Sequence, residues 1–307
     1  MEHKKWNITD FPEFELAITI DRPELYYDFL QKDWTRFCHD YWKNNFLEHH
    51  TLSQKRVTRI YIGNQFCHNL FPRKELLFQV LEKALENNLA VTLAFSYIRN
   101  HLLEEIDELL QELEVWCQSR EKEAGKDQEE IIVNDWAMPI LLQGKPHLKP
   151  VLGVLLNKRR KDVRLPYKQG IGNHVDSLAE NNLNCGFYQD YLKNTFDIQR
   201  FEFESCGYKV TIPDGHHSLH LPFFQTNTSQ YCTLYAVCRY GDRGKQKLPE
   251  NCPRYCNKKV FLYPKHLKMV GRYNSLFGYD EKILWDEKQL QDYLEQGIER
   301  IVVNVSL

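Results

Sequence analysis

Nine cysteines occur in this 307-residue chain, and four of them fall within residues 231–259. Cys232, Cys238, Cys252 and Cys256 are separated by five, thirteen and three residues. The residues between them are rich in Gly, Pro and basic side chains and follow no apolar period. These cysteines are therefore poor candidates for packing in a core, the usual fate of a free cysteine, and core packing stays open only as the second alternative. Thiolates bind zinc and iron–sulfur clusters, so the spacing predicts a metal site.

The identity of the metal stays open on spacing alone. Structural zinc sites commonly pair their cysteines as C-x2-C knuckles, and this segment has none. The ligands of iron–sulfur clusters can be more widely spread along the chain. A 4Fe-4S cluster and a zinc ion are therefore both consistent with the pattern.

The composition indicates a soluble globular protein with reduced thiols. Hydrophobic residues make up 42% of the chain, which is enough for a substantial core. The 40 basic and 42 acidic side chains nearly cancel, so no overall charge attracts nucleic acid, and a nucleic-acid partner is not expected. The N-terminal residues contain no apolar signal segment, and no later apolar run could span a bilayer. We therefore expect a cytoplasmic protein, whose odd number of cysteines argues against a disulfide framework.

Apolar periodicity predicts helices that alternate with short strands. Leucines recur with helical spacing over 73–88 and 101–116. Eight runs are strand candidates: 14–20, 59–63, 89–95, 131–134, 151–157, 200–205, 259–264 and 298–304. Strands separated by helices form parallel sheets, and eight of them make a barrel, so the predicted fold class is α/β, a TIM-type (β/α)8 barrel. Residues 1–307 are predicted to form a single barrel domain with the metal-binding segment at about 231–259.

Barrel enzymes place their chemistry in the loops after the strands. Asn134, Asp135 and Trp136 end or follow one predicted strand, and Lys158 and Arg159 follow the next. These five are the predicted substrate-binding residues, with Asp135 as a base or ligand and the two cations as a clamp for a carboxylate or phosphate. Two alternatives stay open, a helix cap at Asp135 and a solvated basic turn at Lys158 and Arg159.

The sequence assigns no catalytic residue. His216, His217 and His220 lack the H-E-x-x-H frame of a zinc hydrolase. No pair of nucleophile and base is apparent either, which argues against a hydrolytic function.

Four segments carry a family resemblance: RIYIGNQFCHN, IIVNDWAMPILLQ, VLGVLLNKRRKDVR and YAVCRYGDRGKQKLPENCPRYC. In this order they resemble the collagenase-like peptidase family U-thirty-two, and within it the anaerobic ubiquinone-hydroxylation proteins UbiU and UbiV. The match covers about residues 56–260. In that family a cysteine after an early strand joins three late cysteines to bind a 4Fe-4S cluster. The matching positions here are Cys67, Cys238, Cys252 and Cys256, and Cys232 competes with Cys67 as an alternative fourth ligand.

The resemblance implies an iron–sulfur protein that acts in oxygen-independent hydroxylation, or that serves as partner for it. The implied substrate is a small molecule: a quinone or isoprenoid, another aromatic compound or a modified nucleoside. The resemblance also implies prephenate as oxygen donor and a paralogous barrel protein as partner. Two other functions stay open, a collagenase-like peptidase and a non-catalytic iron–sulfur partner subunit.

Overall fold

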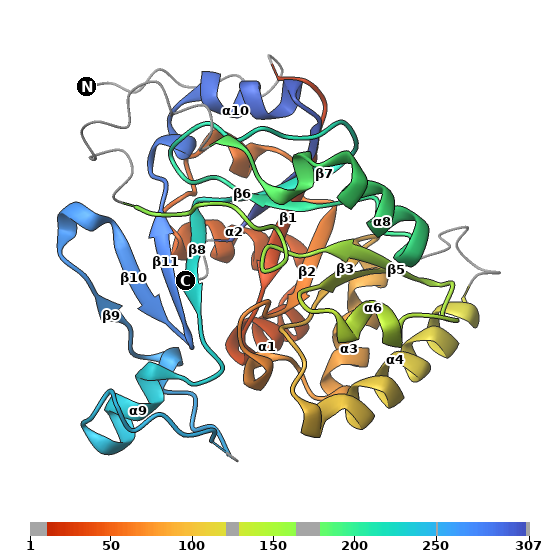
Figure 1. The fold of residues 1–307 in the computed structure, drawn as a ribbon, viewed down its shortest axis with the longest axis vertical. Helices are drawn as coiled ribbons and strands as arrows, with labels where there is room; N and C mark the ends of the chain where they lie inside the picture. Colours follow the sequence, from red (N-terminus) through yellow and green to blue (C-terminus); the bar gives the residue numbers. More distant parts are fainter. Residues whose placement is uncertain (1–10, 121–128, 164–178, 250, 305–307) are drawn as a thin grey trace.

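The computed structural model describes residues 11–120, 129–163, 179–249 and 251–304. Residues 1–10, where we expect no signal segment, lie outside the described residues. Figure 1 shows a parallel sheet covered by helices, with a smaller antiparallel sheet beside it.

Eight parallel strands form the larger sheet, in the order β5-β4-β3-β2-β1-β12-β7-β6. They are β1 (Glu15–Ile20), β2 (Arg59–Gly63), β3 (Ala90–Ala94), β4 (Glu129–Val133), β5 (Leu148–Leu152), β6 (Glu202–Glu204), β7 (His217–Leu221) and β12 (Ile298–Val303). A parallel bridge joins Leu152, at the end of β5, to Phe201, just before β6, and so brings the two edge strands together. The sheet is a nearly closed, irregular (β/α)8 barrel, and the predicted fold class is confirmed.

Helices cover the outer side of this barrel (Figure 1). They are α1 (Pro23–Gln31), α2 (Trp34–Asn44), α3 (Lys74–Glu86), α4 (Leu103–Gln118), α6 (Ala137–Leu141), α8 (Gly186–Phe196) and α10 (Glu287–Glu295). The helices predicted over 73–88 and 101–116 are α3 and α4. Each buries one leucine-containing face, as the helical spacing of the leucines predicts.

Three strand assignments differ from the structure. The run at 151–157 overlaps β5 only at 151–152, and residues 154–156 form a turn. The run at 259–264 belongs to the antiparallel sheet as β9 (Phe261–Leu262), so its assignment to the barrel was wrong. The seventh barrel strand is instead β7, which the sequence analysis did not recognise as a strand. Its polar residues His217, Ser218 and His220 obscured an apolar pattern, although all of β7 is buried.

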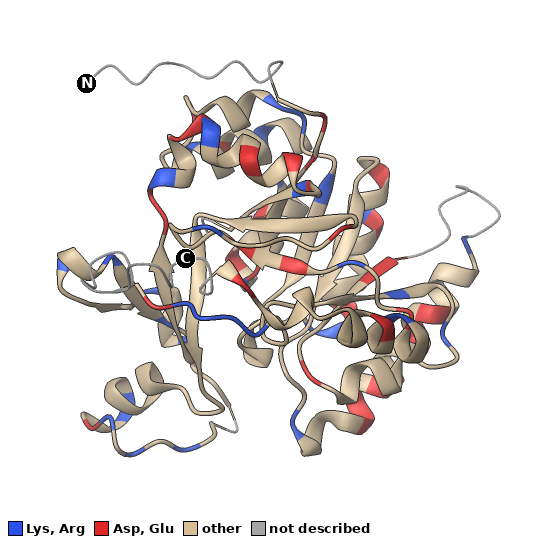
Figure 2. Ribbon diagram, turned by 45° about the horizontal axis from the view of Figure 1, so that its top comes forward, with Lys and Arg blue, Asp and Glu red and all other residues tan. Residues whose placement is uncertain are grey.

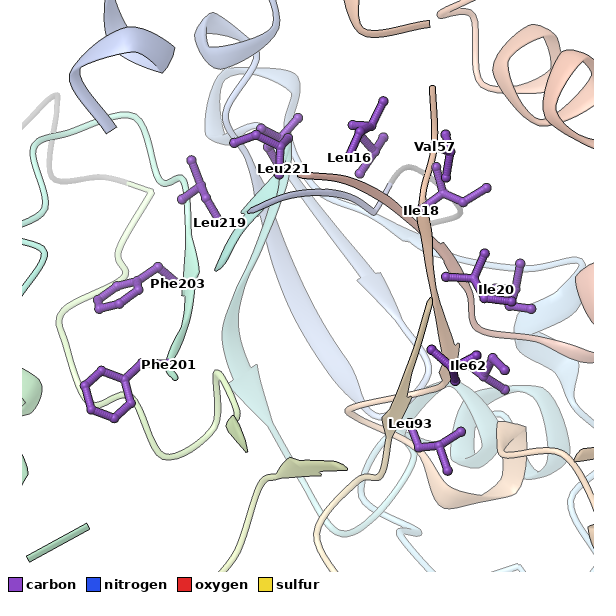
Figure 3. Packing of buried hydrophobic residues seen from close by; sticks show 14 of the residues in the cluster. Leu16, Ile18, Ile20, Val57, Ile62, Leu93, Phe201, Phe203, Leu219 and Leu221 are labelled. Carbon is purple, nitrogen blue, oxygen red and sulfur yellow. The ribbon is translucent and has the colours of Figure 1, made fainter. Parts of the chain in front are cut away.

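Side chains alternate between the two faces of each barrel strand. Along β1, Leu16, Ile18 and Ile20 pack in the main hydrophobic core between strands and helices, whereas Ala17 belongs to a small apolar cluster inside the barrel. Figure 3 shows Leu16, Ile18 and Ile20 together with core residues of β2, β3, β6 and β7. The main core therefore lies outside the barrel wall, which leaves the barrel interior free for polar groups.

A buried charge network occupies the barrel interior. Arg300 of β12 donates to both carboxylate oxygens of Glu130 in β4, at 2.6 and 3.0 Å, and to Glu15 of β1 at 2.6 Å. Arg59 of β2 contacts the same two carboxylates, at 2.9 Å to Glu15 and 3.4 Å to Glu130. Two guanidinium groups thus face two carboxylates. Burial alone would raise the pKa of Glu130, but Arg300 and Arg59 outweigh it and lower the pKa to about 2.

An insertion separates the seventh and eighth barrel strands. It contains a four-stranded antiparallel sheet in the order β8-β11-β10-β9, together with helix α9. Its elements are β8 (Phe223–Thr228), α9 (Thr233–Tyr240), β9, β10 (Met269–Arg272) and β11 (Ser275–Tyr279). Figure 1 shows α9 below this sheet, at the side of the barrel. Four of the cysteines therefore belong to the insertion and not to a barrel loop of ordinary length.

Charged residues of both signs share the surface. Figure 2 shows Lys and Arg interspersed with Asp and Glu over the helices and loops, in agreement with the net charge of −2. Within the described ranges, no helix is long and apolar enough to cross a membrane.

Candidate functional site

The carboxyl ends of the barrel strands enclose a small cavity of about 40 Å³, which we call the mouth cavity. Its walls include Tyr61 of β2, Glu204 of β6, His220 of β7 and Asn304 after β12. A cavity of this size has room for one or a few water molecules. Because barrel enzymes carry their active sites at this end, the mouth cavity is the first candidate site.

A buried histidine–carboxylate pair lies at the mouth cavity. His220 Nε2 is 2.5 Å from Glu202 Oε2, and the Tyr61 hydroxyl donates to Glu202 Oε1 at 3.0 Å. The contact joins an imidazole nitrogen to a carboxyl oxygen, two kinds of group that take part in general acid–base catalysis. Burial raises the pKa of Tyr61 against the opposing charge of Arg300, which keeps the hydroxyl a donor. The pair can therefore accept and return a proton.

A buried lysine reaches the same end of the barrel. The side chain of Lys161, only 9% exposed, forms an ion pair with Glu204, which also accepts the backbone N–H of Gln225 at 2.6 Å. Burial lowers the pKa of Lys161, and the Glu204 charge opposes that shift. The basic segment after β5 thus contributes a cation to the barrel mouth, but through Lys161 and not through Lys158 or Arg159.

The sequence analysis did not select Glu202, Glu204 or His220. One signal could have found the two acids. Phe201 and Phe203 alternate with Glu202 and Glu204, and a strand whose aromatic face meets the helices must point its other face into the barrel. Acidic residues at alternate positions of such a strand therefore indicate a polar barrel interior.

Asn134 and Asp135 hold the loops at the strand ends together. The Asn134 amide donates to Phe95 O at 2.7 Å and accepts from Leu155 N at 3.2 Å. A Cβ at position 153 would come within 2.1 Å of the Asn134 oxygen, so Gly153 is required there. Asp135 accepts the backbone N–H groups of Ala137 and Met138, both at 3.0 Å, and that of Ile98. The hydrogen bonds to Ala137 and Met138 are those of a helix cap, which was the alternative to substrate binding for Asp135.

None of the five predicted substrate-binding residues lines the mouth cavity. Trp136 is 41% exposed and packs against Tyr191 and Phe196 of α8. Lys158 is exposed, and its ammonium donates to Leu155 O. Arg159 is partly buried, contacts Cys206 Sγ and lies over the Tyr208 ring at 5.7 Å.

Five cysteines meet where the insertion packs against the loop after β2. Cys67, Cys232, Cys238 and Cys256 belong to one apolar cluster whose other members include Leu70, Leu234, Tyr273 and Phe277. Cys252 joins them through electrostatic interactions with Cys67, Cys232 and Cys256. Phe66 and Tyr273 pack in this cluster and also line the mouth cavity. The group of five, which we call the thiol cluster, therefore shares a wall with the barrel mouth.

The cysteines of this cluster form no disulfides. All nine cysteines of the chain are unpaired. Burial raises the pKa of Cys67 and of Cys256 to about 12, and the neighbouring thiols add to the effect. Cys232 accepts the backbone N–H of Tyr235 at 3.3 Å, at the start of α9. As positioned in the described part of the chain, no three His, Cys, Asp or Glu side chains form a group that could hold a metal ion.

Comparisons with models of known protein families, with curated proteins and with solved structures find no match for this chain.

Proposed function

We propose that this chain is an iron–sulfur protein of oxygen-independent hydroxylation. Cys67, Cys252 and Cys256 hold a 4Fe-4S cluster, and a fourth thiolate comes from Cys232 or Cys238. The observation that carries this proposal is the meeting of cysteines from two distant segments beside the mouth of a barrel. The family resemblance of the same segments supplies the reaction class.

The residues present fit such a cluster in two respects. The donors are all thiols, the soft ligands that iron–sulfur clusters use. The surrounding Leu70, Leu234 and Phe277 are buried apolar side chains that exclude water. A four-iron cluster is also wider than a single ion, so its thiolates lie farther apart than the ligands of one metal ion. Binding would displace the thiol protons, as metal binding to cysteine does in general.

When bound, the cluster would supply one-electron chemistry beside the barrel mouth. The chain itself would handle the accompanying protons. His220, which contacts Glu202 and lines the mouth cavity, would take up and return protons there. Tyr61 fixes the other carboxylate oxygen and so keeps the pair in place. A carboxylate-bearing oxygen donor such as prephenate, and a related barrel protein as partner, complete the proposal on the basis of the resemblance.

Metal analysis and cell growth together test this function. Wild-type protein purified without oxygen is expected to contain about four iron and four labile sulfide per chain. Cells that lack the gene and grow without oxygen are expected to lose a hydroxylated product, which returns with the wild-type gene but not with Cys252→Ser. Stoichiometric zinc without labile sulfide would overturn the cluster. Cluster-independent cleavage of peptides by the pure protein would point to the peptidase instead.

His220→Gln is expected to keep its iron and to reduce formation of the hydroxylated product by about 10²-fold, because proton transfer from a positioned side chain contributes that much or more. The measurement is the product level in anaerobic cells that carry each variant, alongside iron content and thermal melting of the purified protein. His216→Gln is the matched control, since His216 also contacts a glutamate, Glu299, but on the surface. Full product formation by a folded His220→Gln protein would remove His220 from the mechanism.

A further inference from the structure

A second and larger cavity opens on the outer side of the thiol cluster. It has a volume of about 640 Å³, within the range of small-molecule pockets. Its walls are the loops after β2 and β3, one face of α4, and residues 251, 252 and 254 of the insertion. We call it the lateral groove. His68 and Asn69 line this groove, whereas Phe66 lines the mouth cavity, so the segment that carries Cys67 separates the two.

Part of the lining of the lateral groove, which we call its floor, is apolar. Phe71 and Phe95 stack with ring centroids 4.3 Å apart and an interplanar angle of 24°. Leu102, Ile106 and Leu109, at or within the start of α4, extend this floor. An apolar ligand body lying on the floor would remove its own surface and that of the floor from water, which is the main source of affinity in such pockets.

The two long sides of the lateral groove differ in charge. Arg73 and Arg254 belong to the loops and Lys74 to the start of α3, whereas Glu105, Glu108 and Glu112 belong to α4. Lys74 is paired with Glu112 at 3.0 Å, which leaves the two arginines as the cations that face an anionic ligand. Arg254 stands between Cys252 and Cys256 in the left-handed backbone region, at φ +53°. Its Nε donates to Asn69 O at 3.2 Å, which uses one of the five N–H donors of a guanidinium. An anionic group is therefore attracted to the Arg254 side and repelled from the α4 side.

We propose that the lateral groove binds a small apolar carboxylate, with its apolar body on the Phe71–Phe95 floor and its carboxylate on Arg254. The ligand then lies against Cys252, a residue of the groove wall. The further claim that this ligand is the substrate of the cluster rests on the proposed function. The claim that the groove binds the ligand does not depend on the cluster.

Calorimetric titration with a matched pair of probes tests the groove. The probes are 2-naphthoate, an aromatic carboxylate, and 2-naphthamide, its neutral counterpart of nearly the same shape. Wild-type protein purified without oxygen is expected to bind the carboxylate at least about tenfold more tightly, because only the carboxylate makes a charge-assisted hydrogen bond with Arg254. Arg254→Gln is expected to bring the two affinities together.

Two further variants make the result specific. Ile106→Asp places a negative charge on the floor of the groove and is expected to weaken the binding of 2-naphthoate at least about tenfold. Arg36→Gln removes an exposed arginine of α2, which pairs with Asp40 away from the groove, and is expected to change neither affinity. Equal binding of the two probes by the wild type, or unchanged preference in Arg254→Gln, would overturn the proposal.

Iron content measured on the same samples separates this proposal from the proposed function. Selective carboxylate binding by protein without iron would support the groove and count against the cluster. An iron-loaded protein that binds both probes equally would support the cluster and count against the groove. If Arg254→Gln loses iron or melts early, the comparison of probes on the wild type and on Ile106→Asp decides.

Discussion

Cys67→Ser and Cys256→Ser proteins purified without oxygen are expected to contain less than about one iron per chain, against about four in the wild type. A serine oxygen is a harder and far less acidic ligand than a cysteine sulfur. A cluster that keeps only three cysteine ligands is therefore expected to be lost during purification. The change replaces one atom and largely preserves the packing around Leu70 and Phe277. Iron and labile-sulfide assays, with the visible spectrum, measure the outcome.

Cys38→Ser is the matched control for this loss. Cys38 packs against the main hydrophobic core, and burial raises its pKa to about 12, the same value as for Cys67. The control therefore removes another partly buried thiol with a raised pKa, from a place without other cysteines of the thiol cluster. Full iron in Cys67→Ser, or equal iron loss in Cys38→Ser, would show that Cys67 is not a ligand.

The same assay decides the fourth ligand. The family resemblance points to Cys238, and both Cys232 and Cys238 pack in the thiol cluster. Cys232 is favoured by its place just before the first turn of α9. The N–H of Tyr235 that Cys232 accepts at the start of α9 would also stabilise a thiolate there. We therefore expect Cys232→Ser to lose iron and Cys238→Ser to retain more of it. The opposite order would restore the ligand set that the resemblance implies.

Helices and strands with one apolar face could be predicted from the sequence. The stretches at 73–88 and 14–20 became α3 and β1 because their apolar residues follow the periods of a helix and a strand. The run at 259–264 has the same strand-like composition, but composition does not say which sheet a strand joins. β7 escaped notice because its interior face consists of Ser218 and His220, which belong to the polar contents of the barrel.

The candidate site was accessible only in part. Thiols in close spacing could be recognised as a group, and a family pattern connected Cys67 to them. The carboxylates Glu202 and Glu204 and the ammonium of Lys161 become a site only when strand closure brings β6 beside the mouth cavity. Polar residues directly after strands were a poor guide, because Asn134 and Asp135 satisfy backbone groups of neighbouring loops. A polar residue at a strand end can serve the fold as readily as a ligand.

Arg300→Met is expected to reduce the free energy of unfolding at pH 7 by about 3–5 kcal/mol, the usual cost of removing one partner of a buried ion pair. Arg300 is 2% exposed and bonds both oxygens of Glu130. Its loss leaves that buried carboxylate with a hydrogen bond from the Thr92 hydroxyl at 2.8 Å and with the more distant cations Arg59 at 3.4 Å and Arg200 at 3.6 Å. Urea denaturation followed by circular dichroism measures the change. Lys74→Met removes half of an exposed ion pair, with Glu112, and is expected to have little effect.

The pH dependence of this difference shows whether it arises from the carboxylates that Arg300 contacts, mainly Glu130 and also Glu15. The folded protein holds the pKa of Glu130 at about 2, below the ordinary value of 4.5, so the carboxylate contributes about 3 kcal/mol of stability. Because the folded pKa is the lower one, this contribution is complete above pH 4.5 and disappears as the pH falls through 2. Wild type and Arg300→Met are therefore expected to differ most at neutral pH and to converge toward pH 3 and below. A stability difference that stays constant from pH 7 to pH 3 would mean that Arg300 acts through packing and not through the charge of Glu130.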